Sequence, residues 1–230
     1  MKTIGLLGGM SWESTANYYQ AINQEVKRVL GGLHSAKICL FSVDFAEIEK
    51  LQQLGQWQQA AELLAKSAQA VEAGGADFLL ICTNTMHNVA PQISAAISIP
   101  LLHIADATAE HLGSDGLQKV GLLGTRFTME QDFYRQRISD KFGIEVIIPN
   151  PAQRQFIHQV IYQELCLGKL LASSRQQFVE IILQLQQQGA QGVILGCTEI
   201  AMLVQQSHCT VPLYDTTQIH AIAAVKRALS

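Results

Sequence analysis

Short apolar runs alternate along the chain with longer segments whose apolar positions repeat at helical spacing. The short runs predict strands near residues 3–7, 37–43, 77–82, 100–103, 118–123, 143–148, 191–195 and 211–214. The longer segments predict amphipathic helices over residues 14–30, 57–73, 129–141, 152–165 and 174–188. Strands that alternate with helices are typical of βα units around a parallel sheet, so the pattern predicts the α/β class.

Two stretches of the chain recur at nearly the same offset. The segment GLLGGM at residues 5–10 returns as GLLGTR at residues 121–126, and ADFLLICTNT at 76–85 resembles AQGVILGCTE at 190–199. Each match is a strand that runs into a polar turn, so we interpret the pair as traces of two related α/β halves. The second match aligns Thr83 with Cys197.

This repetition predicts two pseudo-symmetric Rossmann-like lobes, each a short, mainly parallel sheet flanked by helices. We expect the first lobe to comprise residues 1–98 plus 213–230 and the second residues 99–212. Ligands of open parallel sheets bind beyond the carboxyl ends of the strands. We therefore expect the active site between the lobes, with Thr83 and Cys197 on opposite walls.

Net charge, the lengths of the apolar runs and the spacing of Cys and His exclude several classes of partner and location. With 16 Lys and Arg against 19 Asp and Glu, the net charge of −3 gives no basic field for nucleic acid. The longest apolar runs, such as Phe78–Cys82, are far shorter than the roughly 18 residues of a membrane helix, and no signal peptide is visible. The five cysteines lack CxxC spacing and the histidines lack HxxxH spacing, so we expect no metal and a cytoplasmic chain with free thiols.

The turn after the first predicted strand is rich in glycine. Gly8-Gly9-Met10-Ser11 lacks the third glycine of a dinucleotide loop and the G-K-[ST] ending of a P-loop. Two interpretations stay open. The backbone amides could approach a small anion such as a carboxylate, or the segment could be a tight strand-to-helix turn capped by Ser11 or Ser14.

The strongest local signals are two other turns, CTNTMH at residues 82–87 and GCTEI at residues 196–200. Each places a nucleophilic side chain beside hydroxyl or amide donors where a strand ends and a helix begins. Asn84 and Thr198 could instead be helix caps, Glu199 could favour the helix dipole, and Cys197 could be an inert buried thiol. Recurrence of the same turn chemistry in both halves favours a functional role.

These two turns, with GLLGGM near the start and VPLYD at residues 211–215, resemble the aspartate/glutamate racemase family over essentially the whole chain. The resemblance implies two similar α/β lobes, a homodimer, no cofactor and a small amino-acid substrate. It also implies one cysteine per lobe, on opposite faces of the substrate Cα. One cysteine, as thiolate, removes the α-proton, and the other, as thiol, returns a proton from the far side.

The chain departs from that pattern at the first cysteine. Aligning Asn84-Thr85 with the family's C-N-T motif places Thr83 at the acid/base position, and Cys82 should face the other way because neighbouring strand residues alternate. We expect Cys197 to be the working base, with its pKa lowered by a helix N-terminus, and reprotonation to come from the Thr83 side. In racemases of this family the second-lobe cysteine takes the proton of the L-enantiomer, so the resemblance implies that L-to-D turnover is the easier direction to observe.

The remaining candidate residues would bind the substrate. We expect donors to its carboxylate from Asn84, Thr85 and Thr198, and further contacts from Met10, Gln52 and Glu199. His87 could tune the acid or be an ordinary, satisfied helix histidine.

The residues that would contact the substrate side chain leave two interpretations open. No arginine lies between residues 42 and 59, so a side-chain carboxylate could be held by Gln52, although Gln52, Gln53 and Gln56 could equally form a solvated helix face. Lys169 could supply a charge or lie at the surface. Aspartate and glutamate are the expected substrates, with room for a broader range. The alternatives are a hydantoin racemase, maleate isomerase or arylmalonate decarboxylase-like enzyme, or a non-catalytic, two-lobed small-molecule binding protein.

Overall fold

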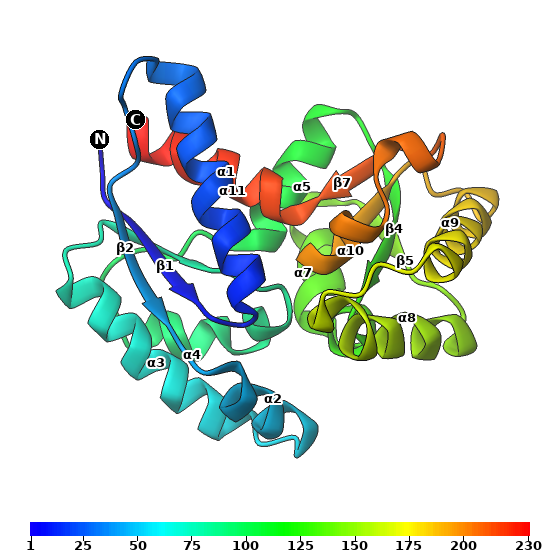
Figure 1. Ribbon diagram of the computed structural model, residues 1–230, viewed down its shortest axis with the longest axis horizontal. Coiled ribbons are helices and arrows are strands. Elements are labelled where there is room, and N and C mark those ends of the chain that lie inside the picture. The colour runs from blue at the N-terminus through cyan, green and yellow to red at the C-terminus, as the bar shows by residue number, and fades with distance from the viewer. The chain divides into compact units, whose positions relative to one another are not determined.

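The computed structural model describes residues 1–230 and divides into two compact units (Figure 1). The first unit is Met1–Ile104 with His220–Ser230, and the second is Ala105–Ile219. Both units consist of a parallel sheet flanked by helices, which confirms the predicted α/β class. None of the helices combines the length and apolar character needed to cross a bilayer.

The first unit contains a three-stranded parallel sheet in the order β2 (Ile38–Ser42), β1 (Ile4–Gly8), β3 (Phe78–Ile81). One face is covered by α1 (Trp12–Leu30) and α11 (Thr216–Leu229), which lie together in Figure 1. The other face is covered by α2 (Phe45–Gln53), α3 (Trp57–Ala73) and α4 (Ala90–Ala95). Each face buries its own apolar cluster, built around Tyr18 on one side and Leu64 on the other.

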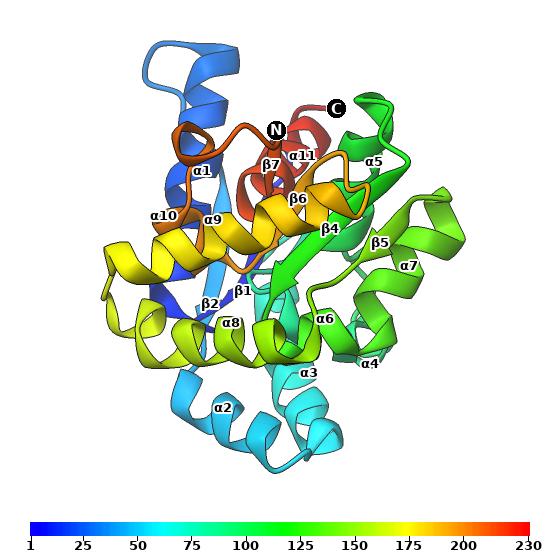
Figure 2. The same ribbon diagram turned by 90° about the vertical axis from the view of Figure 1, so that its right-hand side faces the viewer.

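The second unit contains a four-stranded parallel sheet in the order β5 (Glu145–Ile147), β4 (Lys119–Gly124), β6 (Val193–Gly196), β7 (Leu213–Asp215). Figure 2 shows α8 (Pro151–Gln163) and α9 (Ala172–Gln187) running across this sheet. Its other helices are α5 (Ile104–Ser114), α6 (Arg126–Glu130), α7 (Asp132–Phe142) and α10 (Thr198–Leu203). Short 3-10 helices are η1 (Thr85–Val89) in the first unit, and η2 (Leu165–Leu167) and η3 (Gln206–His208) in the second.

The two sheets share one strand order around their central strands. β1 lies between β2 and β3, and β4 lies between β5 and β6. In both central strands a glycine allows a helix to pack closely against the sheet. A Cβ on Gly5 would come within 2.6 Å of Val71 in α3, and one on Gly121 within 2.9 Å of Leu185 in α9. The shared order and the paired glycines support the interpretation of two related halves.

The unit boundaries differ from those expected at residues 98/99 and 212/213. β7 hydrogen-bonds to β6, so the chain remains in the second unit until Ile219. At the earlier crossing, Leu101 makes a single parallel bridge with Leu79, and the first unit continues to Ile104.

Two predicted elements are wrong in extent. The predicted strand at 100–103 is only that bridge, because Pro100 has no N–H to donate and α5 begins at Ile104. The predicted helix over 129–141 is two helices, since Gln131 is extended at φ −84° and ψ 150° between α6 and α7.

Candidate active site

Thr83 lies two residues beyond Ile81, the last residue of β3, and its side chain is partly exposed. The neighbouring Cys82 is fully buried among Leu6, Tyr18 and Leu80 in the cluster beneath α1. Burial raises the pKa of the Cys82 thiol, and its carbonyl oxygen accepts a hydrogen bond from Ser14 Oγ at 3.1 Å. Cys82 is therefore a small core side chain, and Thr83 is the exposed member of the pair.

The residues after Thr83 turn into η1. Asn84 precedes this 3-10 helix and Thr85 begins it, and both side chains are buried. His87, also buried, places Nδ1 2.8 Å from the Thr83 carbonyl oxygen, and its Nε2 accepts the Ile104 N–H at 3.2 Å. Of the two interpretations of His87, the structure supports a ring with both nitrogens hydrogen-bonded.

The glycine-rich turn is held by internal hydrogen bonds. Gly9 has φ +92°, and a Cβ there would clash with the Val43 carbonyl oxygen. Its N–H donates to Thr15 Oγ1 at 2.8 Å, and Ser11 caps α1 by accepting from the Ser14 N–H at 3.3 Å. The Gly9 N–H is thus already hydrogen-bonded within the protein, and this favours the capped turn over an anion-binding site.

Two predicted binding residues are buried in the first unit. Met10 packs in the apolar cluster beneath α3. Gln52 is 3% exposed, and its Nε2 donates to Met86 Sδ at 2.8 Å, which joins α2 to η1. Gln53 and Gln56 are exposed, so a solvated helix face describes them but not Gln52.

Cys197 is the N-cap of the short helix α10, immediately after β6, with an extended backbone at φ −153° and ψ 130°. The partly buried thiol donates a hydrogen bond from Sγ to Glu199 Oε2 at 2.9 Å. Burial raises the pKa of this thiol well above its ordinary value, and the Glu199 carboxylate and Cys166 raise it further. The expectation that the helix N-terminus lowers this pKa is wrong, because burial and the neighbouring negative charge dominate.

The other residues of this turn are tied to the start of α11. Thr198 Oγ1 lies 2.8 Å from Thr217 Oγ1, and Thr216 Oγ1 donates to the Leu195 carbonyl oxygen at 3.0 Å. Asp215, the last residue of the VPLYD segment, accepts the Thr217 N–H at 2.9 Å and so caps α11. Burial raises the pKa of Asp215.

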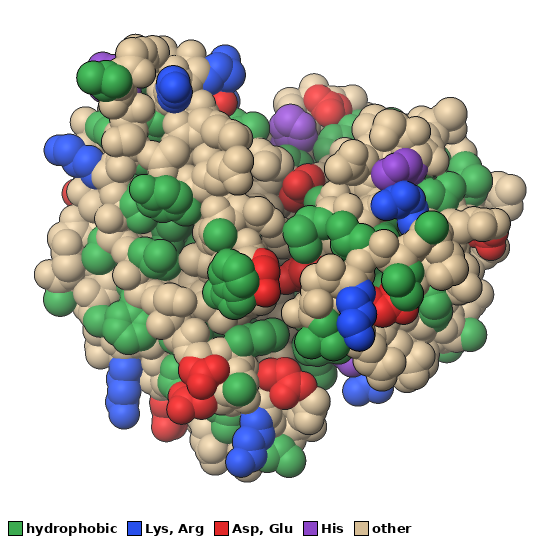
Figure 3. Space-filling view, in the orientation of Figure 1, with side chains coloured by type: hydrophobic (Ala, Val, Ile, Leu, Met, Phe, Trp, Pro, Cys, Tyr) green, Lys and Arg blue, Asp and Glu red, His purple; other side chains and the backbone are tan.

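Sequence reasoning missed the role of Cys166, which lies in η2 and contributes to the raised pKa of the Cys197 thiol. No sequence signal connects them, because η2 and α10 come together only through the tertiary fold. Lys169 is exposed, as expected of a surface lysine. Lys and Arg side chains are likewise scattered, with no single basic patch, on the face drawn in Figure 3.

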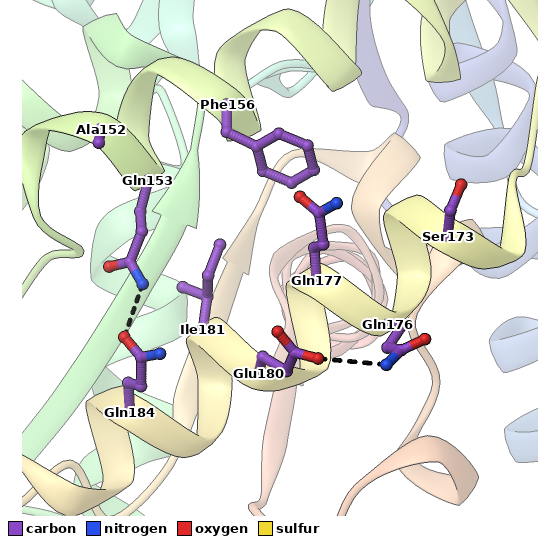
Figure 4. A pocket seen from close by; sticks show the side chains of 9 residues that line it. All are labelled: Ala152, Gln153, Phe156, Ser173, Gln176, Gln177, Glu180, Ile181 and Gln184. Atoms are coloured by element: carbon purple, nitrogen blue, oxygen red, sulfur yellow. Dashed lines mark hydrogen bonds between the residues drawn. The ribbon is translucent and has the colours of Figure 1, made fainter.

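A pocket of about 560 Å³ lies between α8 and α9 (Figure 4). A hydrogen bond from Gln153 Nε2 of α8 to Gln184 Oε1 of α9 at 2.6 Å joins its two walls, and within α9 Gln176 Nε2 donates to Glu180 Oε1 at 3.2 Å. It is lined by Ala152, Gln153, Phe156, Ser173, Gln176, Gln177, Glu180, Ile181 and Gln184. This lining includes none of the residues predicted to act on substrate, so the pocket is not the candidate active site.

Comparison with known proteins extends these observations. Residues 7–224 match the model of the family described as Asp/Glu/Hydantoin racemase. A proposed Asp/Glu racemase from Yersinia pestis is 56% identical, covers 100% of both chains and superposes with a TM-score of 0.93. An aspartate racemase homologue from Pyrococcus horikoshii is 31% identical over 100% of both chains, with a TM-score of 0.86.

One curated relative is more distant in sequence. The broad specificity amino-acid racemase RacX of Bacillus subtilis (strain 168) is 22% identical over an alignment of 244 positions, which covers 99% of this chain and 98% of that protein. The likeness therefore extends over the full length of both proteins.

Proposed function

The chain belongs to the Asp/Glu/Hydantoin racemase family, and on that premise we propose that it is a cofactor-independent amino-acid racemase in which Cys197 and Thr83 exchange the α-proton. One observation carries the assignment of these two residues. Ile81 pairs with Leu7 in the first sheet and Leu195 pairs with Leu123 in the second. Thr83 and Cys197 each follow two residues later, so they occupy equivalent positions in the two units.

Inversion at a carbon atom requires a base on one face and an acid on the other. In the proposed reaction the Cys197 thiolate takes the α-proton of the L-amino acid, and the C–H electron pair stays on the substrate as a carbanion. A proton then reaches the opposite face of Cα from the side of Thr83, either from its hydroxyl or from a water that it orients. Cys197 is left as a thiol, which exchanges its hydrogen with solvent and either returns a proton to the same face of the carbanion, giving exchange without inversion, or loses its proton to solvent before the next turnover.

The substrate itself helps to ionise Cys197. The α-hydrogen and the ammonium nitrogen are both bonded to Cα, so a thiol that reaches the hydrogen is close to the ammonium cation. An opposite charge within about 4–6 Å lowers a pKa by roughly 1–3 units. This effect acts against the burial and the Glu199 charge that raise the pKa of the thiol in the free protein.

Replacing a thiol by a hydroxyl makes the two directions unequal in rate. A threonine hydroxyl has a pKa near that of bulk water, roughly seven units above that of a thiol. At about 1.36 kcal/mol per unit, Thr83 is disfavoured as a base by roughly 10 kcal/mol. The asymmetry is kinetic, since the enzyme leaves the equilibrium between enantiomers unchanged.

We propose aspartate and glutamate as the first substrates, with a range broader than these two. Asn84, Thr85 and Thr198 would donate to the α-carboxylate, and the Gln52 amide would donate to a side-chain carboxylate. No arginine is present between residues 42 and 59 to impose a full charge, which supports a less selective site. The broad specificity of the curated relative favours the same view.

Hydrogen exchange at Cα in heavy water tests the proposed reaction. The protein is incubated in D₂O with a panel of L- and D-amino acids, and deuterium at Cα and the enantiomer ratio are both measured. We expect deuterium uptake from L-aspartate or L-glutamate together with slower inversion. Absence of uptake across the panel would contradict racemisation and favour the non-catalytic binding protein. Uptake with a hydantoin, or conversion of maleate or an arylmalonate without amino-acid exchange, would favour the other enzymes.

We also propose that the protein is a homodimer, as the family resemblance implies. The mass in dilute solution, measured by light scattering after size-exclusion chromatography, tests this directly. The expected value is twice the 25.2 kDa of one chain.

A further inference from the structure

The His87 imidazole joins the Thr83 turn to the place where the chain leaves the first unit. Nδ1 lies 2.8 Å from the Thr83 carbonyl oxygen, and Nε2 lies 3.2 Å from the Ile104 nitrogen. Ile104 is the last residue of the first unit before the chain crosses into the second. One buried ring therefore contacts both the proposed acid and the crossing point.

These two partners determine the state of the ring. A carbonyl oxygen can only accept, so Nδ1 must carry a proton and donate it to Thr83. A backbone N–H can only donate, so Nε2 must be unprotonated to accept from Ile104. His87 is therefore a neutral imidazole in the Nδ1–H tautomer, and a proton on Nε2 would remove the bond to Ile104.

A second buried histidine lies where the chain returns to the first unit, and the roles of its two ring nitrogens are reversed. His220 is the first residue after the chain re-enters the first unit, and its Nε2 donates to the Leu102 carbonyl oxygen at 2.9 Å. Its Nδ1 then accepts from the Tyr18 hydroxyl at 2.8 Å. The His87 ring packs edge-on to His103 at 4.5 Å and to His220 at 6.1 Å between centroids.

We propose that His87 is a positioning residue for proton return from the Thr83 side, through its Nδ1–H bond to the Thr83 carbonyl oxygen. This inference rests on the proposed racemase function. The bond fixes the peptide plane between Thr83 and Asn84, and with it the direction of the Thr83 hydroxyl and of the amide that follows. Cys197 belongs to the other unit and makes no use of this bond, so only one half of the reaction depends on it.

Two substitutions separate the two ring nitrogens. Asn places its amide where Nδ1 lies, so His87→Asn keeps a donor for the Thr83 carbonyl oxygen and loses the acceptor for Ile104. Gln reaches the position of Nε2, so His87→Gln keeps the acceptor and loses the donor. Both variants are polar and uncharged, and each removes one of the two hydrogen bonds, so a general loss of stability should affect them alike.

The experiment compares deuterium exchange and inversion of L-glutamate in D₂O for the wild type and both variants. In H87Q we expect exchange, which needs Cys197 alone, to stay within about threefold, while net inversion falls by about tenfold or more, equivalent to about 1.4 kcal/mol of barrier. In H87N we expect both rates to stay within about threefold, a barrier change below about 1 kcal/mol. KM for L-glutamate should change little in either variant.

Equal loss of inversion in H87N and H87Q would overturn the proposal, as would exchange and inversion falling together in H87Q. A wild type without any exchange would instead overturn the proposed function, and the role of His87 in the reaction with it. The tautomer is tested separately by long-range ¹H–¹⁵N spectra of the imidazole, with H87N as the assignment control. We expect the Nδ1–H form, and a ring protonated at Nε2 would contradict the geometry whatever the activity.

Discussion

The Cys197 thiol donates its proton to Glu199 Oε2 at 2.9 Å, so the proposed base is held in its protonated form by its own neighbour. Burial and this carboxylate raise the pKa of Cys197. The fraction of reactive thiolate is therefore small at neutral pH and grows as the pH rises.

The first prediction concerns this pH dependence. Because the thiolate is the base, kcat/KM for exchange of L-glutamate should rise about tenfold per pH unit below the pKa of Cys197. Glu199→Gln removes the negative charge that raises this pKa, so the rising limb should move to lower pH. Exchange rates measured from about pH 6 to pH 10 test both statements. Glu180→Gln, an exposed change on α9, is the matched control, and a profile that Glu199→Gln does not move would contradict the argument.

Cys197 and Cys82 should respond in opposite ways. Cys197→Ser replaces the base by a much weaker one, and exchange should fall by on the order of 10³, within the usual range for loss of a general base. Cys82→Ala removes a buried sulfur from the cluster around Tyr18, which should cost about 1 kcal/mol of stability and leave exchange within about twofold. Activity lost at Cys82 and kept at Cys197 would show that the alignment of the first turn is shifted by one residue.

Restoring a thiol at position 83 should make the enzyme more symmetric. Thr83→Cys supplies a base on the second face, so exchange that starts from D-glutamate should speed up by at least about tenfold. Thr83→Ser keeps a hydroxyl and serves as the control, with little change expected. An unchanged rate from the D-enantiomer in Thr83→Cys would argue against Thr83 as the proton-returning position.

Gln52 offers a test of substrate choice. Gln52→Leu removes the amide proposed to bind a side-chain carboxylate, so KM for L-glutamate should rise about tenfold, equivalent to one hydrogen bond to a charged group. KM for L-methionine should stay nearly constant, because its side chain has no carboxylate. Gln53→Leu on the exposed face of the same helix should affect neither substrate. Equal changes for both substrates would assign Gln52 a packing role.

The glycine-rich turn should depend on one hydroxyl. Thr15→Val leaves the Gly9 N–H without its buried acceptor and also removes the bond from Thr15 Oγ1 to the Ser11 carbonyl oxygen. This change should lower the free energy of unfolding by about 1–3 kcal/mol in urea titrations. Thr15→Ser retains the oxygen and should lose less than half as much. A loss in Thr15→Ser as large as that in Thr15→Val would contradict a dominant role of the hydroxyl.

Much of the fold could be predicted because its signals are local. The helix over Trp57–Ala73 has the predicted bounds, since its periodic apolar positions end at Gly74-Gly75. The break at Gln131 could not be predicted, because no proline or glycine marks it and only tertiary packing separates α6 from α7.

The candidate site also has features that the sequence predicts and features that it does not. The equivalence of Thr83 and Cys197 was visible as an internal repeat, and the burial of Cys82 followed from strand alternation. The direction of the Cys197 pKa was not predictable from its helix position. It depends on the Glu199 carboxylate turning back toward Sγ and on burial that includes Cys166, and both are properties of the folded chain.

The chain crosses between the two units twice, and this constrains how it folds while it is being synthesised. The second unit is one continuous stretch, Ala105–Ile219, whereas the first needs both ends of the chain. Ala221, Ala224 and Val225 fill the core beside Tyr18, and the Lys2 N–H donates to the Ala228 carbonyl oxygen at 2.8 Å. The first unit therefore cannot complete its core until the last helix of the chain has been synthesised, although its sheet is translated first. Domains usually fold in the order in which they are translated, and the unit that begins this chain cannot do so without the residues that end it.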